Sequence, residues 1–160
     1  MASIGLIGLG NAGRPLAERI LAKGHSLTVF DIDTGALDRV VQRGARPAHS
    51  AGAAVSDITI TLLPSSLEVR QAVLGANGVL SALRPASTVI DLSGTDPDCA
   101  RELEERLREK QAMFIGGTIH ASGAPAVVIP QGRFSIVIGG EKTRIAPAAG
   151  GTILNVFTLP

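Results

Sequence analysis

Short apolar runs alternate with stretches of helical periodicity along most of the chain. Four runs are rich in Ile, Val, Leu and Thr, which is typical of buried strands. They are residues 4–8, 26–31, 57–64 and 87–93. Four other stretches repeat apolar residues at helical spacing and are predicted to be helices. They are residues 15–21, 34–43, 66–74 and 96–110.

Several residues support these helix boundaries. Gly24 and Gly44 follow the first two predicted helices, where glycine commonly ends a helix. Thr34 is expected to cap the second helix through its side chain. Pro97 follows Asp96 near the first position of the fourth helix, where its fixed φ angle suits the helix and its missing N–H costs nothing.

The last part of the chain carries further strand signals. Residues 112–117, 133–140 and 153–157 are predicted to be strands, and residues 146–151 a flexible loop. Because strands and helices alternate from the start, the pattern predicts an α/β fold, with a doubly wound, mostly parallel sheet and helices on both faces. The length of 160 residues predicts one domain, residues 1–160.

Composition and charge exclude several classes of function. The formal net charge is +1 with no basic run, so we expect neither nucleic acid nor a membrane surface as partner. Cys99 is the single cysteine, which rules out an internal disulfide and fits a cytoplasmic location. Three scattered histidines make no metal site. We see no targeting signal and no apolar run of membrane-spanning length.

A glycine turn between the first strand and helix carries the strongest chemical signal. Its residues are Gly8, Leu9, Gly10, Asn11, Ala12 and Gly13, a Gly-x-Gly-x-x-Gly motif. In a dinucleotide site, the first glycine permits the tight turn, the second lets the pyrophosphate approach, and the third packs the helix on the strand. The position of the motif, after a strand and at the opening of a helix, predicts a Rossmann-type fold. A plain turn without ligand is the alternative.

Asp31, which ends the second strand, indicates which dinucleotide binds. A carboxylate there accepts hydrogen bonds from the adenosine ribose and repels a 2′-phosphate. Ile32 and Asp33 follow, so no arginine stands ready for that phosphate, and Arg39 is expected on the surface of the next helix. The sequence therefore predicts NAD, with NADP less favoured. A Walker-type loop is excluded because no Gly-Lys-Ser/Thr follows.

Four ordered stretches together resemble a known family. They are GLIGLGNAGRPLAERIL, TLLPSSLEVRQAVLGANGVL, STVIDLSGTDPDCARELEERL and FIGGTIHASGAPAVVIPQGRFSIVIGG, within residues 2–140. They are similar to the N-terminal NAD(P)-binding domain of the β-hydroxyacid dehydrogenases, the family of 3-hydroxyisobutyrate dehydrogenase and tartronate semialdehyde reductase. That family is related to 6-phosphogluconate dehydrogenase.

The resemblance implies roles for residues outside the glycine turn. Leu63 and Pro64 would line the adenosine side of the cofactor, and Ser93 would lie near the nicotinamide ribose. Ser122 and Gly123 match a family motif that holds the substrate carboxylate. His120 precedes that motif and is either a further carboxylate ligand or a loop residue. The substrate implied is a small β-hydroxy acid.

The chain also departs from the family pattern. Gly94 stands where the family has threonine, and Ala124 where it has a second glycine. The segment from residue 114 to 132 is a few residues longer than in the family, so the register of Ser122 is open by one or two positions. No Lys-x-x-x-Asn motif follows the last strand, so the resemblance assigns no catalytic residue within these 160 residues. It also leaves out the family's C-terminal helical domain, through which full-length members oligomerise.

Other polar residues have structural interpretations. Asp91 is expected to make structural hydrogen bonds, Cys99 to pack in a core, and Lys142 to be solvated. Three functional hypotheses follow for the chain: the nucleotide domain of an oxidoreductase that moves a hydride between NAD and a small hydroxy acid, a truncated or degenerate NAD-binding module without catalysis, and a regulatory domain that senses a nucleotide.

Overall fold

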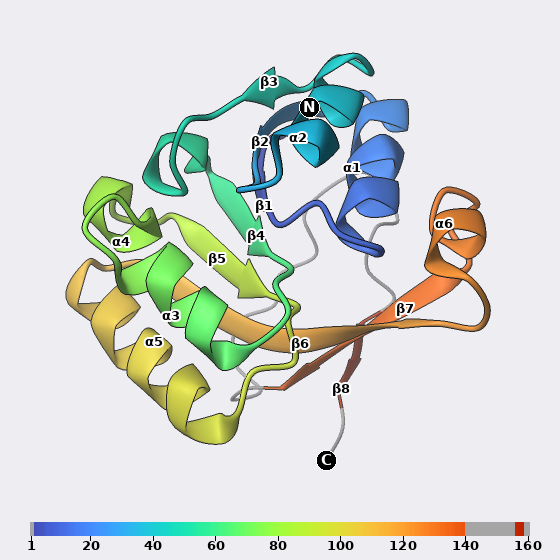
Figure 1. Ribbon diagram of the computed structural model, residues 1–160. Helices are drawn as coiled ribbons and strands as arrows, with labels where there is room; N and C mark the ends of the chain where they lie inside the picture. Colours follow the sequence, from blue (N-terminus) through green and yellow to red (C-terminus); the bar gives the residue numbers. More distant parts are fainter. Residues whose placement is uncertain (1, 140–155, 159–160) are drawn as a thin grey trace.

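One sheet organises the whole described chain. The computed structural model describes residues 2–139 and 156–158. Its eight strands lie in the order β3-β2-β1-β4-β5-β6-β7-β8 (Figure 1). Neighbouring strands from β3 to β6 are parallel, β6 and β7 are antiparallel, and β7 and β8 are parallel. The predicted α/β fold with a mostly parallel sheet is therefore confirmed.

The strands and helices alternate over the first half of the chain. The strands are β1 (Ser3–Ile7), β2 (Ser26–Phe30), β3 (Arg46–Pro47), β4 (Ile58–Thr61), β5 (Thr88–Asp91), β6 (Met113–Ala121), β7 (Phe134–Gly139) and β8 (Val156–Thr158). The helices are α1 (Gly13–Ala22), α2 (Thr34–Val41), α3 (Ser66–Leu74), α4 (Val79–Ala82), α5 (Pro97–Glu109) and α6 (Pro125–Val128), with a 3-10 turn, η1, at Gly52–Ala54.

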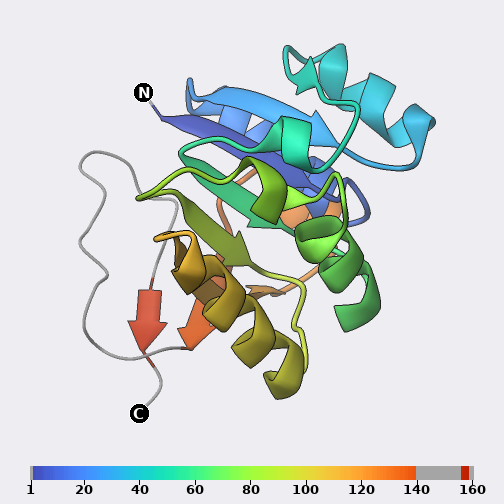
Figure 2. The same ribbon diagram turned by 90° about the vertical axis from the view of Figure 1, so that its left-hand side faces the viewer.

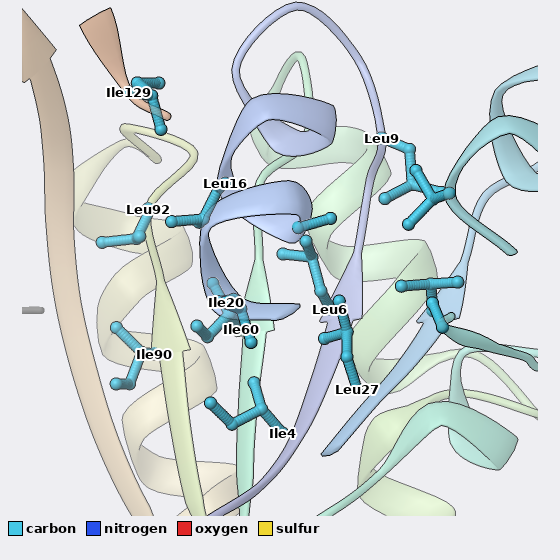
Figure 3. Packing of buried hydrophobic residues seen from close by; sticks show 14 of the residues in the cluster. Ile4, Leu6, Leu9, Leu16, Ile20, Leu27, Ile60, Ile90, Leu92 and Ile129 are labelled. Atoms are coloured by element: carbon cyan, nitrogen blue, oxygen red, sulfur yellow. The ribbon is translucent and has the colours of Figure 1, made fainter. Parts of the chain in front are cut away.

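Helices cover both faces of the sheet, so there are two apolar cores. On one face, α1, α2 and α6 pack against the sheet, and Leu16, Ile20 and Ile129 meet strand residues such as Leu6 and Ile60 (Figure 3). On the other face lie α3, α4 and α5, which stand in front of the sheet in Figure 2. Burial on both faces explains why the central strands are continuous apolar runs.

The helix caps differ from the sequence prediction at one place. The expectation that Thr34 caps α2 is wrong, because Asp33 is the N-cap and its Oδ1 accepts hydrogen bonds from the N–H groups of Gly35 and Ala36. Asp33 has extended backbone angles, φ −81° and ψ 102°, which a cap residue needs. Asp96 caps α5, and Pro97 begins that helix as predicted.

The second half of the sheet was predicted less well. The predicted strand 112–117 continues to Ala121, so His120 lies in a strand and pairs with Ser135 of β7. The helices α4 and α6 and the short strand β3 were not predicted. The last predicted strand, 153–157, is found at Val156–Thr158, while residues 153–155, the predicted loop 146–151 and Lys142 lie outside the described residues.

Candidate functional site

The glycine turn lies at the carboxyl end of β1, in the middle of the sheet. Strand β1 has β2 on one side and β4 on the other, so the chain order reverses here, which is where ligands bind in doubly wound folds (Figure 1). The N–H of Gly8 donates to the carbonyl of Phe30, 3.0 Å away. Gly8 has φ +99°, and a Cβ there would lie 2.2 Å from the carbonyl oxygen of Leu62. Only glycine fits this position.

The other two glycines of the motif have different surroundings. A Cβ on Gly13 would lie 2.0 Å from the carbonyl oxygen of Gly8, so the first turn of α1 touches the end of β1 directly. A Cβ on Gly10 would meet no atom within 4 Å, and Gly10 is exposed. The space beside Gly10 is therefore open to a ligand, while Gly8 and Gly13 are needed for packing.

The start of α1 presents hydrogen-bond donors to this open side. Within the part of the chain that the structure describes, the N–H groups of Asn11, Ala12 and Gly13 donate to no acceptor. The N-cap, Ala12, supplies no side-chain cap. Unpaired N–H groups at a helix N-terminus, together with the positive end of the helix dipole, attract a phosphate. The turn thus fits a pyrophosphate in both space and charge.

Asp31 joins the glycine turn to the end of β2. Its Oδ2 accepts a hydrogen bond from the N–H of Leu9 at 2.6 Å, and its Oδ1 accepts one from the N–H of Asp33 at 2.8 Å. Each carboxylate oxygen has a second lone pair for a ligand hydroxyl. The carboxylate is therefore fixed beside the turn, as a ribose-binding acid must be.

The loops after β4 and β5 are linked at the same edge of the sheet. The hydroxyl oxygen of Ser93 accepts a hydrogen bond from the N–H of Leu63 at 2.9 Å. Pro64, the next residue, is exposed. Because the Ser93 oxygen already accepts the Leu63 N–H, its own proton is available to a ligand. The structure thus brings together three of the residues to which the resemblance gives a cofactor role.

A buried carboxylate lies beneath Ser93. Asp91, only 1% exposed, accepts hydrogen bonds from the hydroxyls of Thr61 and Thr95, at 2.7 and 2.8 Å, and from the N–H of Ser93 at 3.2 Å. These bonds fix the turn after β5 against β4. They agree with the structural role predicted for Asp91. The Asp91–Thr61 contact joins two strands, and sequence reasoning did not find it.

The three predicted substrate-binding residues lie further along β6 and beyond its end. His120 is exposed near the end of the strand, and Ser122 and Gly123 form the exposed bend before α6. The residue that pairs with Ser93 is Thr118, through a single β-bridge. No hydrogen bond links His120, Ser122 or Gly123 to the other site residues in the described chain. Their substrate role stays a prediction.

The segment after this bend is anchored to α1. Val128 and Ile129 are buried in the same core as Leu16, and Ile129 points toward that core in Figure 3. An N–H of the Arg19 guanidinium donates to the carbonyl of Pro130 at 3.0 Å. The bend at Ser122 is therefore held on the same face as the helix that follows the glycine turn.

Two groups at the start of α5 have shifted pKa values. The Ser66 hydroxyl and the N–H of Cys99 lower the pKa of the Asp96 carboxyl, because both hydrogen-bond to it. Burial raises the pKa of the Cys99 thiol, which agrees with the packing role predicted for it. Neither group faces the glycine turn in a way that gives it a chemical role.

Metals and membranes find no support in the described chain. Among residues 2–139 and 156–158, no group of three His, Cys, Asp or Glu side chains could hold a metal ion. No helix in those residues is long and apolar enough to cross a membrane.

Comparisons with known proteins agree with this geometry. Residues 3–154 match the family described as the NAD binding domain of 6-phosphogluconate dehydrogenase. A probable mitochondrial 3-hydroxyisobutyrate dehydrogenase of Dictyostelium discoideum is 33% identical over 147 residues, which are 88% of this chain and 43% of that protein. The NAD-dependent L-serine dehydrogenase of Pseudomonas aeruginosa is 32% identical over 150 residues, which are 92% of this chain and 49% of that protein.

A solved structure shows the same arrangement of elements. It is 3-hydroxyisobutyrate dehydrogenase of Mycobacterium tuberculosis with L-serine, which matches with a TM-score of 0.78 at 28% identity. The match covers 89% of this chain and 47% of that one. The chain spans about half the length of the curated relatives it matches.

Proposed function

The chain belongs to the family of the NAD binding domain of 6-phosphogluconate dehydrogenase, and from that premise we propose that it is the NAD-binding part of an oxidoreductase acting on a small β-hydroxy acid. The observation that carries the proposal is the glycine turn. It combines free N–H groups at the start of α1 with open space beside Gly10, at the central crossover of the sheet.

Each cofactor-binding residue has a role in this proposal. The N–H groups of residues 10–13 hold the pyrophosphate, and the Asp31 carboxylate accepts hydrogen bonds from the adenosine ribose. Leu63 and Pro64 contact the adenosine side, and the free proton of the Ser93 hydroxyl points to the nicotinamide ribose. We propose NAD over NADP because a second negative charge at the ribose would face Asp31.

The nicotinamide ring, when bound, supplies the chemistry by accepting or giving a hydride. This chain's own part is to orient the ring and to bind the acid. Ser122, Gly123 and His120 are proposed to donate hydrogen bonds to the substrate carboxylate. The relatives whose names specify 3-hydroxyisobutyrate or L-serine support a small hydroxy acid as substrate class. We further propose that residues 1–160 fold as one domain and act in the cytoplasm.

Calorimetric titration of the chain with NAD and with NADP tests the proposal. We expect NAD to bind more tightly, and Gly10→Val to weaken binding by on the order of 100-fold, because a branched side chain would occupy the pyrophosphate position. Gly10→Val should still fold, since a Cβ at Gly10 meets no atom within 4 Å. A folded variant that binds NAD as tightly as the parent would contradict the proposed site.

The alternative is a module that binds NAD without catalysis. It is favoured by one observation: the chain spans about half the length of its curated relatives. An assay of NADH formation with 3-hydroxyisobutyrate, glycerate and L-serine separates the two. Binding without turnover by the chain alone, with turnover when the remainder of a homologous enzyme is supplied, supports the oxidoreductase over the binding module.

A further inference from the structure

Asp33 lies two residues after the ribose-binding acid and closes the first turn of α2. Its Oδ1 accepts hydrogen bonds from the N–H groups of Gly35 at 2.9 Å and Ala36 at 3.3 Å. Its own N–H donates to Oδ1 of Asp31 at 2.8 Å. The carboxylates of Asp31 and Asp33 are therefore tied into one turn, and the nearest backbone donors are already used.

We propose that Asp33 is a second determinant of nucleotide choice, which excludes the 2′-phosphate of NADP by occupying the amide groups that this phosphate would need. The proposal rests on the proposed function, since it takes the adenosine ribose to lie at Asp31. It assigns to Asp33 a role in specificity in addition to its role as a helix cap.

The donor count at this turn supports the proposal. A 2′-phosphate attached to a ribose at Asp31 needs several hydrogen-bond donors to replace its water shell. The N–H groups of Asp33, Gly35 and Ala36 are all engaged by carboxylate oxygens. The 2′-hydroxyl of NAD needs no such set, because the free lone pairs of Asp31 suffice.

The charge at this turn acts in the same direction. Arg39 belongs to the same end of α2, because its Nε donates to the carbonyl of Gly35 at 3.0 Å. Asp31, Asp33 and Arg39 together carry one net negative charge, which repels a phosphate. Without the charge of Asp33 the three positions would sum to zero, and the guanidinium would be the nearest cation to the phosphate.

The test measures the dissociation constants of NAD and NADP for four variants and the parent. Asp33→Ser keeps a good N-cap residue but removes the charge, and Asp33→Asn is a second neutral cap in case the first folds poorly. Asp31→Ala removes the primary acid. Asp38→Asn is the matched control, because it removes one exposed negative charge from α2 outside this turn.

We expect Asp33→Ser and Asp33→Asn to raise NADP affinity by roughly tenfold, from the loss of one like charge near the phosphate. NAD affinity should change less than about twofold, and Asp38→Asn should move either constant less than about twofold. Asp31→Ala should narrow the difference between the cofactors mainly by weakening NAD, because Asp33 still excludes the phosphate.

Two results would overturn the role of Asp33. One is that neither neutral variant raises NADP affinity more than Asp38→Asn does. The other is that both raise NAD and NADP affinity equally, which would mean a change in the fold of the turn. Failure of the proposed function looks different, since the parent chain itself would then bind no NAD.

Discussion

The buried N–H of Leu9 donates a hydrogen bond to the carboxylate of Asp31, with 2.6 Å between the nitrogen and Oδ2. Leu9 is 2% exposed, so water cannot take the place of this acceptor. The bond joins the glycine turn after β1 to the end of β2, 22 residues further along the chain. Asp31 therefore shapes the phosphate-binding turn in addition to facing the ribose.

The first prediction follows from this bond. Asp31→Ala should lower the free energy of unfolding by about 1–3 kcal/mol, because the Leu9 N–H is left buried without an acceptor. Urea denaturation followed by circular dichroism measures the change. Asp57→Ala is the control, since Asp57 is an exposed acid just before β4. If both variants are equally stable, the bond contributes nothing to the fold.

The second prediction compares two glycines of the same motif. Gly13→Ala should destabilise the fold by about 2–4 kcal/mol, because its Cβ would lie 2.0 Å from the carbonyl oxygen of Gly8 and both are backbone-fixed. Gly10→Ala should change stability by less than about 1 kcal/mol, since its Cβ meets no atom within 4 Å. Thermal unfolding of both variants checks the difference, and similar melting temperatures would contradict the close contact of α1 with β1.

Local patterns made the first half of the fold readable from sequence. The central strands are buried on both faces and the helices between them have apolar stripes, so both periods are visible in short windows. The glycine motif is equally local, and its three positions have the surroundings that a dinucleotide turn requires. The bond between Asp31 and Leu9 was not predictable in this way, because it depends on how two strands lie side by side.

The second half was less readable because its pairing is not local. The extension of β6 to Ala121 depends on antiparallel pairing with β7, which places His120 opposite Ser135. Asp33 and Thr34 are both good capping residues, and only the backbone angles of Asp33 decide which one caps α2. The pairing of Ser93 with Thr118 likewise could not be inferred from spacing, so the position of the substrate residues stays open to test.

The third prediction concerns the buried carboxylate beneath Ser93. Asp91→Ala should cost about 3 kcal/mol, because the fully buried Thr61 hydroxyl and the Ser93 N–H both lose their acceptor. Asp91→Asn should recover more than half of that loss, since its amide oxygen can still accept one of these bonds. Equilibrium unfolding in urea distinguishes the two. Equal stability of both variants and the parent would show that the network does not hold the β5 turn.

The last prediction is a pH dependence from Cys99. Burial raises the pKa of the Cys99 thiol above its ordinary value. The folded chain therefore keeps this proton at pH values where the unfolded chain, with a thiol pKa of about 8.5, has lost it. The folded state binds more protons in this range, so the free energy of unfolding should fall as pH rises above about 8.5, by up to about 1.4 kcal/mol per pH unit.

Below pH 8 the thiol is protonated in both states, so Cys99 should contribute no slope there. Cys99→Ala removes the titrating group and is the control: its stability starts lower, because a buried side chain becomes smaller, but it should fall less steeply above pH 8.5. Chemical denaturation at half-unit steps from pH 7 to 10 gives both curves. Parallel curves for the parent and Cys99→Ala would show that the thiol ionises as easily in the folded chain as in the unfolded one.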